Sequence, residues 1–468
     1  MGLFGKGVAI NSVTALMVVG GYIWADINDQ VPGIFTNQPA PSVRTTVNPT
    51  APGAGLGPEI EPYFSTLNTQ AAIPREAKLK PFIAQLASDE RIGPSLGVAI
   101  TDAVSGKMLA SYDAQSPKVP ASTQKTLTAI AALYSLEPDS TISTQVQLND
   151  KNQLVLIGNG DMLLSAQYGD VNAVNGRAGL ADLALATAKE LKAKGVLEVS
   201  LSFDDTLFKG NGYEVWKVEQ VDAGHVAPVA ALGVDMGRKA EGSYAPRYRD
   251  PALVAAQTFS QRLNEQGITV IGEVSRGNKT TTGLNLASVE SAPMRDLVAY
   301  LLQTSDNTLT EIMGRKVALV NGFPATFNGA TQAVLSELVK FGLNTQGIVL
   351  VDCSGLAEGS AVSAAKLNEA LQLAFDSQNF DLRQTLVSLP IAGVQGSLHD
   401  RFLTQGSGIV RGKTGSLPGV TALSGSVFTA DRRLLLFTVI ADKTPGAGQF
   451  DARTAIDEFV LNLVDCGC

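Results

Sequence analysis

The spacing of hydrophobic residues along the chain predicts helices in some segments and strands in others. Apolar residues recur with helical spacing over Lys78–Ala87 and again over Leu127–Leu136. Two short segments between them, Leu96–Asp102 and Lys107–Asp113, are bounded by turn residues and are typical of strands. The globular part of the chain is therefore expected to begin with a helix, two strands and a second helix.

Three more strand-like segments and a helix occupy the far end of the chain. The predicted strands are 408–415, 420–429 and 434–442, and the predicted helix covers about 452–463. Consecutive strands joined by tight turns pair antiparallel. We therefore expect an α/β (α+β) fold, in which one five-stranded antiparallel sheet flanked by helices is built from both ends of the chain.

A central block has its own alternation of elements. Its predicted strands are 145–149, 153–158, 197–204 and 268–275, and its predicted helices are 180–193 and 252–266. Insertion of one domain into another is well tolerated at exposed loops. We expect a catalytic domain formed by residues 66–138 and 285–468, interrupted by a smaller inserted α+β subdomain over residues 139–284.

The N-terminal segment, residues 1–30, contains an uncharged stretch, Gly7–Ala25. Its length suits the roughly 20 residues of a membrane helix, which favours a retained anchor. A cleaved signal would have Ile23 where a small residue is usual, and a buried core helix is the third alternative. Residues 31–65 are rich in Pro, Gly and Thr and predict a flexible linker. An anchor or a signal would export the rest to the cell envelope, outside the cytoplasm.

Composition excludes several classes of function. Lys and Arg number 36 against 44 Asp and Glu, and no dense basic run occurs, so nucleic acid is not an expected partner. With 45% hydrophobic and 17% charged residues, the chain resembles a well-packed enzyme rather than a disordered protein. The 2 histidines and 3 cysteines form neither HExxH nor CxxC, so no metal or other cofactor is expected.

The three cysteines allow one disulfide. Cys466 and Cys468 are too close in sequence for an ordinary bridge, but either could pair with Cys353 in an oxidising compartment. Three unpaired thiols are the alternative.

Three short motifs follow one another in a suggestive order: Ser122-Thr-Gln-Lys125, Ser305-Asp-Asn307 and Lys413-Thr-Gly415. Ser122 is expected to begin a helix, where backbone N–H groups favour developing negative charge, and Lys125 lies one turn later on the same face. A lysine acts as a base only if its pKa falls, through burial or a neighbouring cation such as Lys413.

The second and third motifs are expected to meet the first in one cleft. Ser305 and Asn307 bracket a helix junction, so both can face the cleft while Asp306 turns away. The third motif lies on an edge strand, where Gly415 admits a close backbone approach and a peptide can pair as an added strand.

With Leu156–Asp161, Val351–Leu356 and Gly393–Leu398, these motifs resemble the penicillin-binding D-alanyl-D-alanine carboxypeptidases of low-molecular-mass class C, peptidase family S13. The resemblance covers about residues 78–463. It implies a fold like that of serine β-lactamases and penicillin-binding proteins. It also implies a serine-type D-Ala-D-Ala carboxypeptidase and endopeptidase that acts on peptidoglycan stem peptides through an acyl-enzyme, with β-lactams as covalent inhibitors.

The resemblance assigns roles to residues of all three motifs. In the first two, the nucleophile is Ser122, the base Lys125, the proton relay Ser305 and the residue that binds the peptide backbone Asn307. In the third, the cation is Lys413, and the substrate-binding residues are Thr414, Gly415 and Ser416. The backbone N–H groups of Ser122 and Ser416 would form the oxyanion hole.

Two alternatives share much of this pattern. A serine β-lactamase has the same three motifs but also needs a carboxylate, placed between the second and third motifs, that activates water. Glu311 follows the second motif but shares its helix, which counts against this alternative. A catalytically idle wall-binding or sensor protein would keep the fold and lose the chemistry. All three motifs are intact here, which favours the enzyme.

Overall fold

The computed structural model describes residues 19–26, 28, 30–31, 67–149, 151–279, 283–446 and 449–467. The chain separates into two compact units, Met1–Thr66 and Leu67–Cys468. In the first unit residues 19–26 are helical. Residues 7–18 of the predicted anchor and 32–65 of the predicted linker lie outside the described residues. Within the described ranges, no helix has both the length and the apolar character required to cross a membrane.

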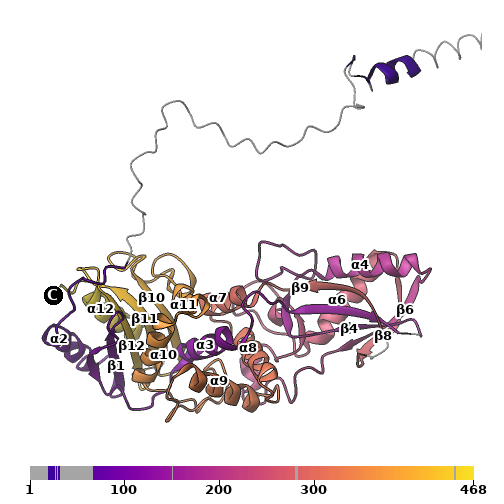
Figure 1. Ribbon diagram of the computed structural model, residues 1–468. Coiled ribbons are helices and arrows are strands. Elements are labelled where there is room, and N and C mark those ends of the chain that lie inside the picture. Colours follow the sequence, from indigo (N-terminus) through magenta and orange to yellow (C-terminus); the bar gives the residue numbers. More distant parts are fainter. Residues whose placement is uncertain are drawn as a thin grey trace, which may run out of the picture. The chain divides into compact units, whose positions relative to one another are not determined.

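The main sheet of the second unit has five antiparallel strands in the order β10-β11-β12-β1-β2 (Figure 1). The strands are β1 (Leu96–Asp102), β2 (Met108–Tyr112), β10 (Val410–Leu417), β11 (Val420–Phe428) and β12 (Leu434–Ala441). The predicted sheet built from both ends of the chain is confirmed.

Helices cover both faces of this sheet, and every residue of β1 and β12 is buried. Successive side chains of a strand point to opposite faces. Phe437 and Val439 therefore pack with α2 (Glu76–Ala87) and α12 (Phe450–Val464), whereas Leu436 and Ile440 pack in the cluster that contains α3 and α10. Burial on both faces explains why β12 is an apolar run interrupted only by Thr438.

A helical layer adjoins the sheet and surrounds α3, which is buried from Lys125 to Leu133. Its helices are α3 (Lys125–Ser135), α7 (Met294–Thr304), α8 (Asn307–Val320), α9 (Phe327–Phe341), α10 (Ala364–Asp376) and α11 (Phe380–Val387). All of the others contact α3. The first motif thus opens the central helix of the unit.

A second sheet has the order β8-β6-β4-β3-β9 and a hydrophobic core of its own. Its elements are β3 (Ser143–Leu148), β4 (Gln153–Ile157), α4 (Leu180–Ala193), β6 (Glu198–Asp204), α6 (Pro251–Glu265), β8 (Thr269–Arg276) and β9 (Leu284–Glu290). Strand β6 pairs in parallel with β4 and β8, and the connections contain α4 and α6, as parallel pairs require. Strand β9 begins at Leu284, runs to Glu290 and pairs antiparallel with β3, so the second sheet includes residues beyond the predicted end of the insert at 284.

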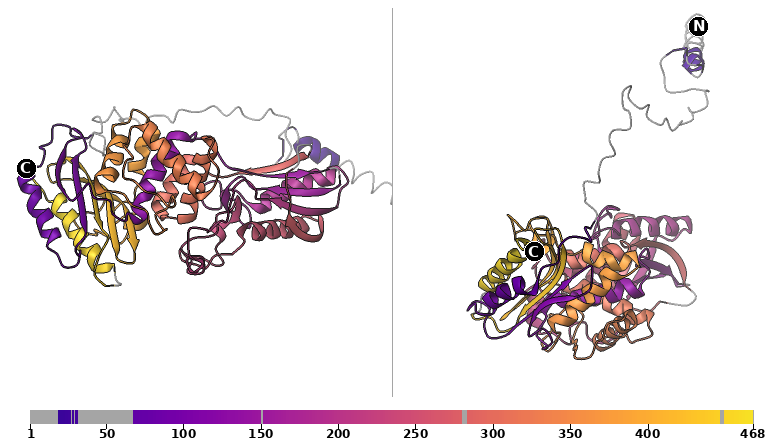
Figure 2. Two further views of the ribbon diagram at one scale, coloured as in Figure 1. Left: turned by 90° about the horizontal axis from the view of Figure 1, so that it is seen from below. Right: turned by 60° about the vertical axis from the view of Figure 1, so that its left-hand side comes forward.

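Within the second unit the two sheets lie at opposite ends, with α3, α8 and α9 between them (Figure 2). Shorter elements complete the unit. They are β5 (Asp161–Leu164), α5 (Val218–Asp222), β7 (Leu232–Val234) and the 3-10 turns η1 (Ala121–Gln124), η2 (Asp235–Gly237) and η3 (Gly396–Leu398).

Candidate active site

The first motif lies on a 3-10 turn rather than at the start of an α-helix. Ser122 belongs to η1, which runs directly into α3 at Lys125, so Ser122 lies at the start of a helical segment as predicted, but its own turn is 3-10 rather than α. Ala121 has a φ of 46°, which is uncommon for any residue but glycine. A Cβ on Gly355 would lie 2.0 Å from the Ala121 carbonyl oxygen, so the loop after Asp352 packs directly on the turn.

Lys125 lies beside Ser122 and is fully buried. Its Nζ is 2.8 Å from Ser122 Oγ, 2.6 Å from Asn307 Oδ1 and 2.8 Å from the Ser354 carbonyl oxygen. Burial lowers the Lys125 pKa from 10.5 to about 8, although nearby carboxylates, chiefly that of Asp352, oppose the change. A neutral amine is therefore accessible near neutral pH, because removal from water disfavours the charge.

The second motif occupies the junction between α7 and α8. Ser305 ends α7 in the left-handed conformation, with a φ of 58°. Asp306 is the N-cap of α8, where it accepts a hydrogen bond from the Leu309 N–H, and it also pairs with Arg238 at 3.1 Å. Ser305 and Asn307 line the cleft as predicted, but Asp306, which was expected to turn away, also lies at its wall, where its carboxylate is held by Arg238.

The third motif lies on β10, the edge strand next to the turn that carries Ser122. Lys413 is fully buried, and its Nζ is 2.8 Å from Ser305 Oγ. Burial and the charge of Lys125 lower the Lys413 pKa well below its ordinary value. A Cβ on Gly415 would lie 2.8 Å from the Pro120 carbonyl oxygen, so only glycine lets β10 approach this closely.

A cleft of about 810 Å³ exposes the reactive groups. Five predicted site residues line it: Ser122, Ser305, Asn307, Thr414 and Ser416. Lys125 and Lys413 are buried behind their serine partners. Ser397, which the motif analysis did not single out, also lines the cleft, and its Oγ lies 2.9 Å from Thr414 Oγ1.

The loop segments before and after β7 contact the start of α8, and sequence patterns did not reveal these contacts. The His225 carbonyl oxygen accepts a hydrogen bond of 2.9 Å from Asn307 Nδ2. Thr308 Oγ1 accepts one of 2.9 Å from the Ala227 N–H, and Arg238 pairs with Asp306. Residues 306, 307 and 308 are thus each held by these loop segments. Two of these contacts use backbone atoms, which leave no signature in the sequence.

The predicted bridge from Cys353 to the C-terminal cysteines is not formed. Cys353 is a buried free thiol against α8, where a Cβ on Gly314 would lie 2.3 Å from its Sγ. Cys466 packs in the other hydrophobic cluster, with α2 and α12, and Cys468 lies outside the described residues. The two sulfur positions therefore belong to different cores.

The chemistry available here follows from two amine–hydroxyl pairs in one cleft. Each serine hydroxyl, Ser122 and Ser305, accepts a hydrogen bond from a buried lysine at 2.8 Å. A buried lysine of lowered pKa can activate a neighbouring hydroxyl as a nucleophile. Within the described residues, no group of three or more His, Cys, Asp or Glu is placed to hold a metal ion.

Comparison with known proteins finds one family over most of the chain. The sequence model of the D-Ala-D-Ala carboxypeptidase 3 (S13) family matches residues 79–241 and 238–463. A carboxypeptidase of Mycobacterium tuberculosis is 34% identical over 410 residues, which cover 85% of this chain and 86% of the relative. Carboxypeptidase DacB of Mycolicibacterium smegmatis is 32% identical over 447 residues, 93% of each chain.

A solved structure shares the fold. Penicillin binding protein 4 of Haemophilus influenzae superposes with a TM-score of 0.70 at 23% identity, over 82% of this chain and 99% of that protein. The same protein has been solved in complex with a β-lactam, and that structure superposes with a TM-score of 0.63.

Proposed function

Since the chain belongs to the D-Ala-D-Ala carboxypeptidase 3 (S13) family, it is a serine-type D-alanyl-D-alanine carboxypeptidase, and we propose that Ser122 forms its acyl-enzyme intermediate. The observation that carries the assignment is the contact of 2.8 Å between Lys125 Nζ and Ser122 Oγ. The contact of 2.8 Å between Lys413 and Ser305 supports the role of the second pair.

In the proposed reaction, neutral Lys125 takes the proton of Ser122 while Ser122 Oγ attacks the penultimate carbonyl of a D-Ala-D-Ala tail. The C–N bond to the last residue then breaks, and Ser305 passes a proton to the departing amine. Water hydrolyses the resulting ester and frees both Ser122 and the shortened peptide. The substrate is a peptidoglycan stem peptide, trimmed at its end or cleaved at a cross-link.

Binding of the substrate is proposed to use the exposed edge of β10. A peptide paired alongside this strand places its terminal carboxylate near the hydroxyls of Thr414 and Ser416, with Gly415 between them. The N–H groups of Ser122 and Ser416 serve as the oxyanion hole. In comparable sites, loss of one such donor costs about 3 kcal/mol of transition-state stabilisation. Asn307 binds the peptide backbone with the amide that His225 orients.

The same geometry favours acylation by β-lactams, whose strained amide takes the place of the scissile peptide bond. Rapid release of that acyl group, as in a β-lactamase, needs a carboxylate in contact with water. Glu311 is fully buried, accepts two backbone hydrogen bonds and pairs with Arg315 at 3.3 Å, and it is not among the residues that line the cleft. We therefore expect a long-lived penicilloyl enzyme.

Two features of organisation belong to the proposal as well. Residues 1–30 hold the catalytic unit at the membrane on the wall side, which the uncharged stretch Gly7–Ala25 supports. Residues 139–284 form an insert in the catalytic domain, which the separate core around β4 and β6 supports.

The decisive experiment incubates the purified chain with muropeptides that end in D-Ala-D-Ala and follows their mass. We expect loss of one terminal alanine by the wild type and no change with Ser122→Ala. A fluorescent penicillin should label the wild type alone, and nitrocefin should turn over only slowly. Trimming that persists in Ser122→Ala would overturn the assignment of the nucleophile. Labelling without trimming would favour the sensor, and rapid nitrocefin turnover the β-lactamase.

A further inference from the structure

The loop over residues 352–357 is attached to α3 and the turn before it through three successive carbonyl groups. The acceptors are the carbonyl oxygens of Asp352, Cys353 and Ser354, and their donors are the side chains of Gln124, Thr128 and Lys125, respectively. The last of these contacts is 2.8 Å long and ends on Lys125 Nζ, the amine beside the nucleophile. The backbone of this loop is thus part of the surroundings of the base.

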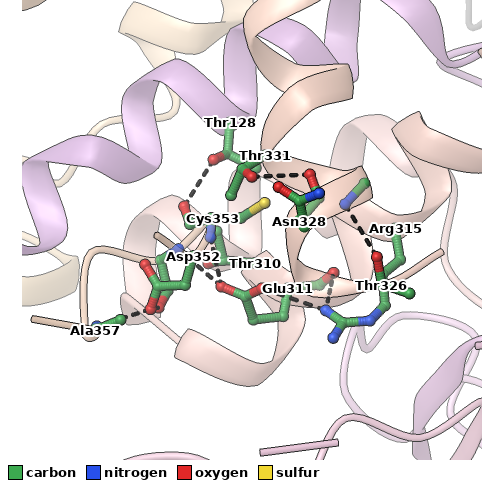
Figure 3. Close-up of polar contacts among 12 residues, drawn as sticks. Thr128, Thr310, Glu311, Arg315, Thr326, Asn328, Thr331, Asp352, Cys353 and Ala357 are labelled. Atoms are coloured by element: carbon green, nitrogen blue, oxygen red, sulfur yellow. Dashed lines mark hydrogen bonds and ion pairs between the residues drawn. The ribbon is translucent and has the colours of Figure 1, made fainter. Parts of the chain in front are cut away.

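Two buried carboxylates, that of Glu311 on α8 and that of Asp352 in the loop itself, accept the backbone N–H groups of the same loop (Figure 3). Oε1 of Glu311 accepts the N–H groups of Cys353 and Ser354 at 2.7 and 2.9 Å. The Asp352 carboxylate accepts the next three N–H groups, those of residues 355, 356 and 357, at 2.7, 3.1 and 2.9 Å. A buried irregular segment needs such acceptors, because an unpaired N–H in the interior is costly.

Glu311 reaches the loop from α8 and has Arg315 on its opposite side, as Figure 3 shows. Its Oε2 lies 3.3 Å from Arg315 Nη1, and the guanidinium lies over the Phe327 ring with its carbon 4.1 Å from the centroid. A buried ion pair of this kind is weak evidence of a contribution to stability, because removing two charges from water offsets their attraction. Its two contacts with the loop suggest a different use.

That use follows from the hydrogen-bonding capacity of Lys125. A neutral amine has two N–H donors and one lone pair, and Lys125 Nζ has three polar neighbours. The Asn307 amide oxygen and the Ser354 carbonyl oxygen can only accept. Only the Ser122 hydroxyl can donate. When both acceptors are in place, the lone pair must therefore point at Ser122, which is the direction that removal of its proton requires.

We propose that Glu311 is a positioning residue for the base: it fixes the Cys353–Ser354 backbone so that the Ser354 carbonyl occupies one Lys125 N–H and directs the lone pair to Ser122. The proposal rests on the assignment of Lys125 as the base. It assigns to Glu311 no contact with substrate. What matters is an acceptor atom at the position of Oε1, not a charge.

The charges around Lys125 have to be kept apart from this effect. Asp352, Asp306 and Glu311 raise the Lys125 pKa, and Lys413 is the cation that faces it. Burial and the charge of Asp352 raise the pKa of Glu311 itself to about 8, against Arg315 and the two loop N–H groups. A fair test therefore compares two variants of equal charge that differ only in the acceptor atom.

The matched pair is Glu311→Gln with Arg315→Met, and Glu311→Met with Arg315→Met. Both double variants lack the ion pair, but only the first retains a side-chain oxygen for the two N–H groups. Fluorescent penicillin at saturating concentration gives the acylation rate of each from pH 6 to 10, and thermal unfolding reports whether each is folded. We expect the glutamine variant within about threefold of the wild-type rate, and the methionine variant at least thirtyfold slower across the pH range, with unchanged penicillin binding.

Equal acylation rates in the two folded variants would overturn the proposal. Should the methionine variant fail to fold, Glu311→Asp supplies the second test, because it keeps the carboxyl group while its shorter side chain withdraws the oxygen. The proposal predicts slow acylation for Glu311→Asp as well, and a wild-type rate would refute it. Lys125→Ala tests the assigned base independently of Glu311. Normal acylation of that variant would refute the role of Lys125 in the proposed function, whatever the Glu311 variants show.

Discussion

The rate of acylation of Ser122 is expected to rise with pH between pH 6 and pH 8 and to level off between pH 8 and pH 9. The cause is the burial of Lys125, which lowers its pKa from 10.5 to about 8. Only the neutral amine can take the Ser122 proton, so the rate follows the deprotonated fraction of Lys125. That fraction rises with pH for any amine, and the lowered pKa of Lys125 moves the rise into the range from pH 6 to pH 8.

The magnitude follows from the shift. With a pKa of about 8, about 1% of Lys125 is neutral at pH 6, about 9% at pH 7 and about 50% at pH 8. With the ordinary pKa of 10.5, only about 0.03% would be neutral at pH 7, roughly 300-fold less. The acylation rate should therefore rise about 50-fold between pH 6 and pH 8 and no more than about twofold beyond.

The assay is the first-order acylation rate at saturating fluorescent penicillin, measured by rapid quenching, with Ser122→Ala as the blank. Saturation removes the contribution of substrate binding, including that of the carboxylate assigned to Thr414 and Ser416. A rate that keeps rising tenfold per pH unit above pH 9 would show that Lys125 keeps an ordinary pKa. A rate independent of pH would show that another group takes the proton. Either result would refute the reasoning from burial.

Four further predictions concern other parts of the molecule. Gly415→Ala should slow acylation at least tenfold with little change in melting temperature, because its Cβ would lie 2.8 Å from the Pro120 carbonyl oxygen and push β10 from the nucleophile turn; a normal rate would contradict the close approach. Arg238→Met should slow acylation about tenfold by freeing Asp306 and the second motif while circular dichroism stays unchanged, and wild-type kinetics would count against the loop contact. Asp102→Asn should lower stability in urea by about 3–5 kcal/mol, because it breaks the buried pair with Arg433. Burial opposes ionisation of Asp102, but hydrogen bonds from Arg433 and Ser105 outweigh it and lower the Asp102 pKa. The stability that the ionised Asp102 contributes is therefore present above about pH 4, where the unfolded group ionises, and is lost as the pH falls through the folded pKa. Asp102→Asn should lack this part of the acid sensitivity. In denaturant without reductant, iodoacetamide should alkylate Cys353, as peptide mass spectrometry can show. An unmodified Cys353 would instead indicate that its thiol is bound in a disulfide.

Local pattern sufficed where an element is long and its apolar residues follow a clear pattern. Helix α4 has the predicted bounds, 180–193, because its apolar spacing persists over several turns. Strands β11 and β12 differ from prediction by one residue at most, because a turn separates them at residues 430–432 and β12 is a nearly continuous apolar run. Strands β5 and β7 were not predicted, since a parallel pair of 4 and 3 residues is too short to have a period.

The motifs indicated which residues carry the chemistry, but not what holds them. The turn at Ser122 depends on the positive φ of Ala121, for which alanine gives no signal. The contact between the His225 carbonyl and Asn307 uses a backbone atom 82 positions away. The cysteine prediction was wrong because spacing says nothing about which core a thiol joins, and Cys353 packs against Gly314. These features depend on tertiary contacts, which no window of sequence contains.

The pairing of β1 with β12 also determines when, during synthesis, the enzyme can become reactive. A growing chain that carries Ser122 and Lys125 still lacks Lys413, and β1 has no neighbour on one edge until the last strand has emerged. Contacts so distant along the chain close slowly and late, and the unpaired apolar edge is exposed to aggregation in the meantime. An incomplete chain therefore contains the nucleophile and its base but not the sheet that assembles the cleft.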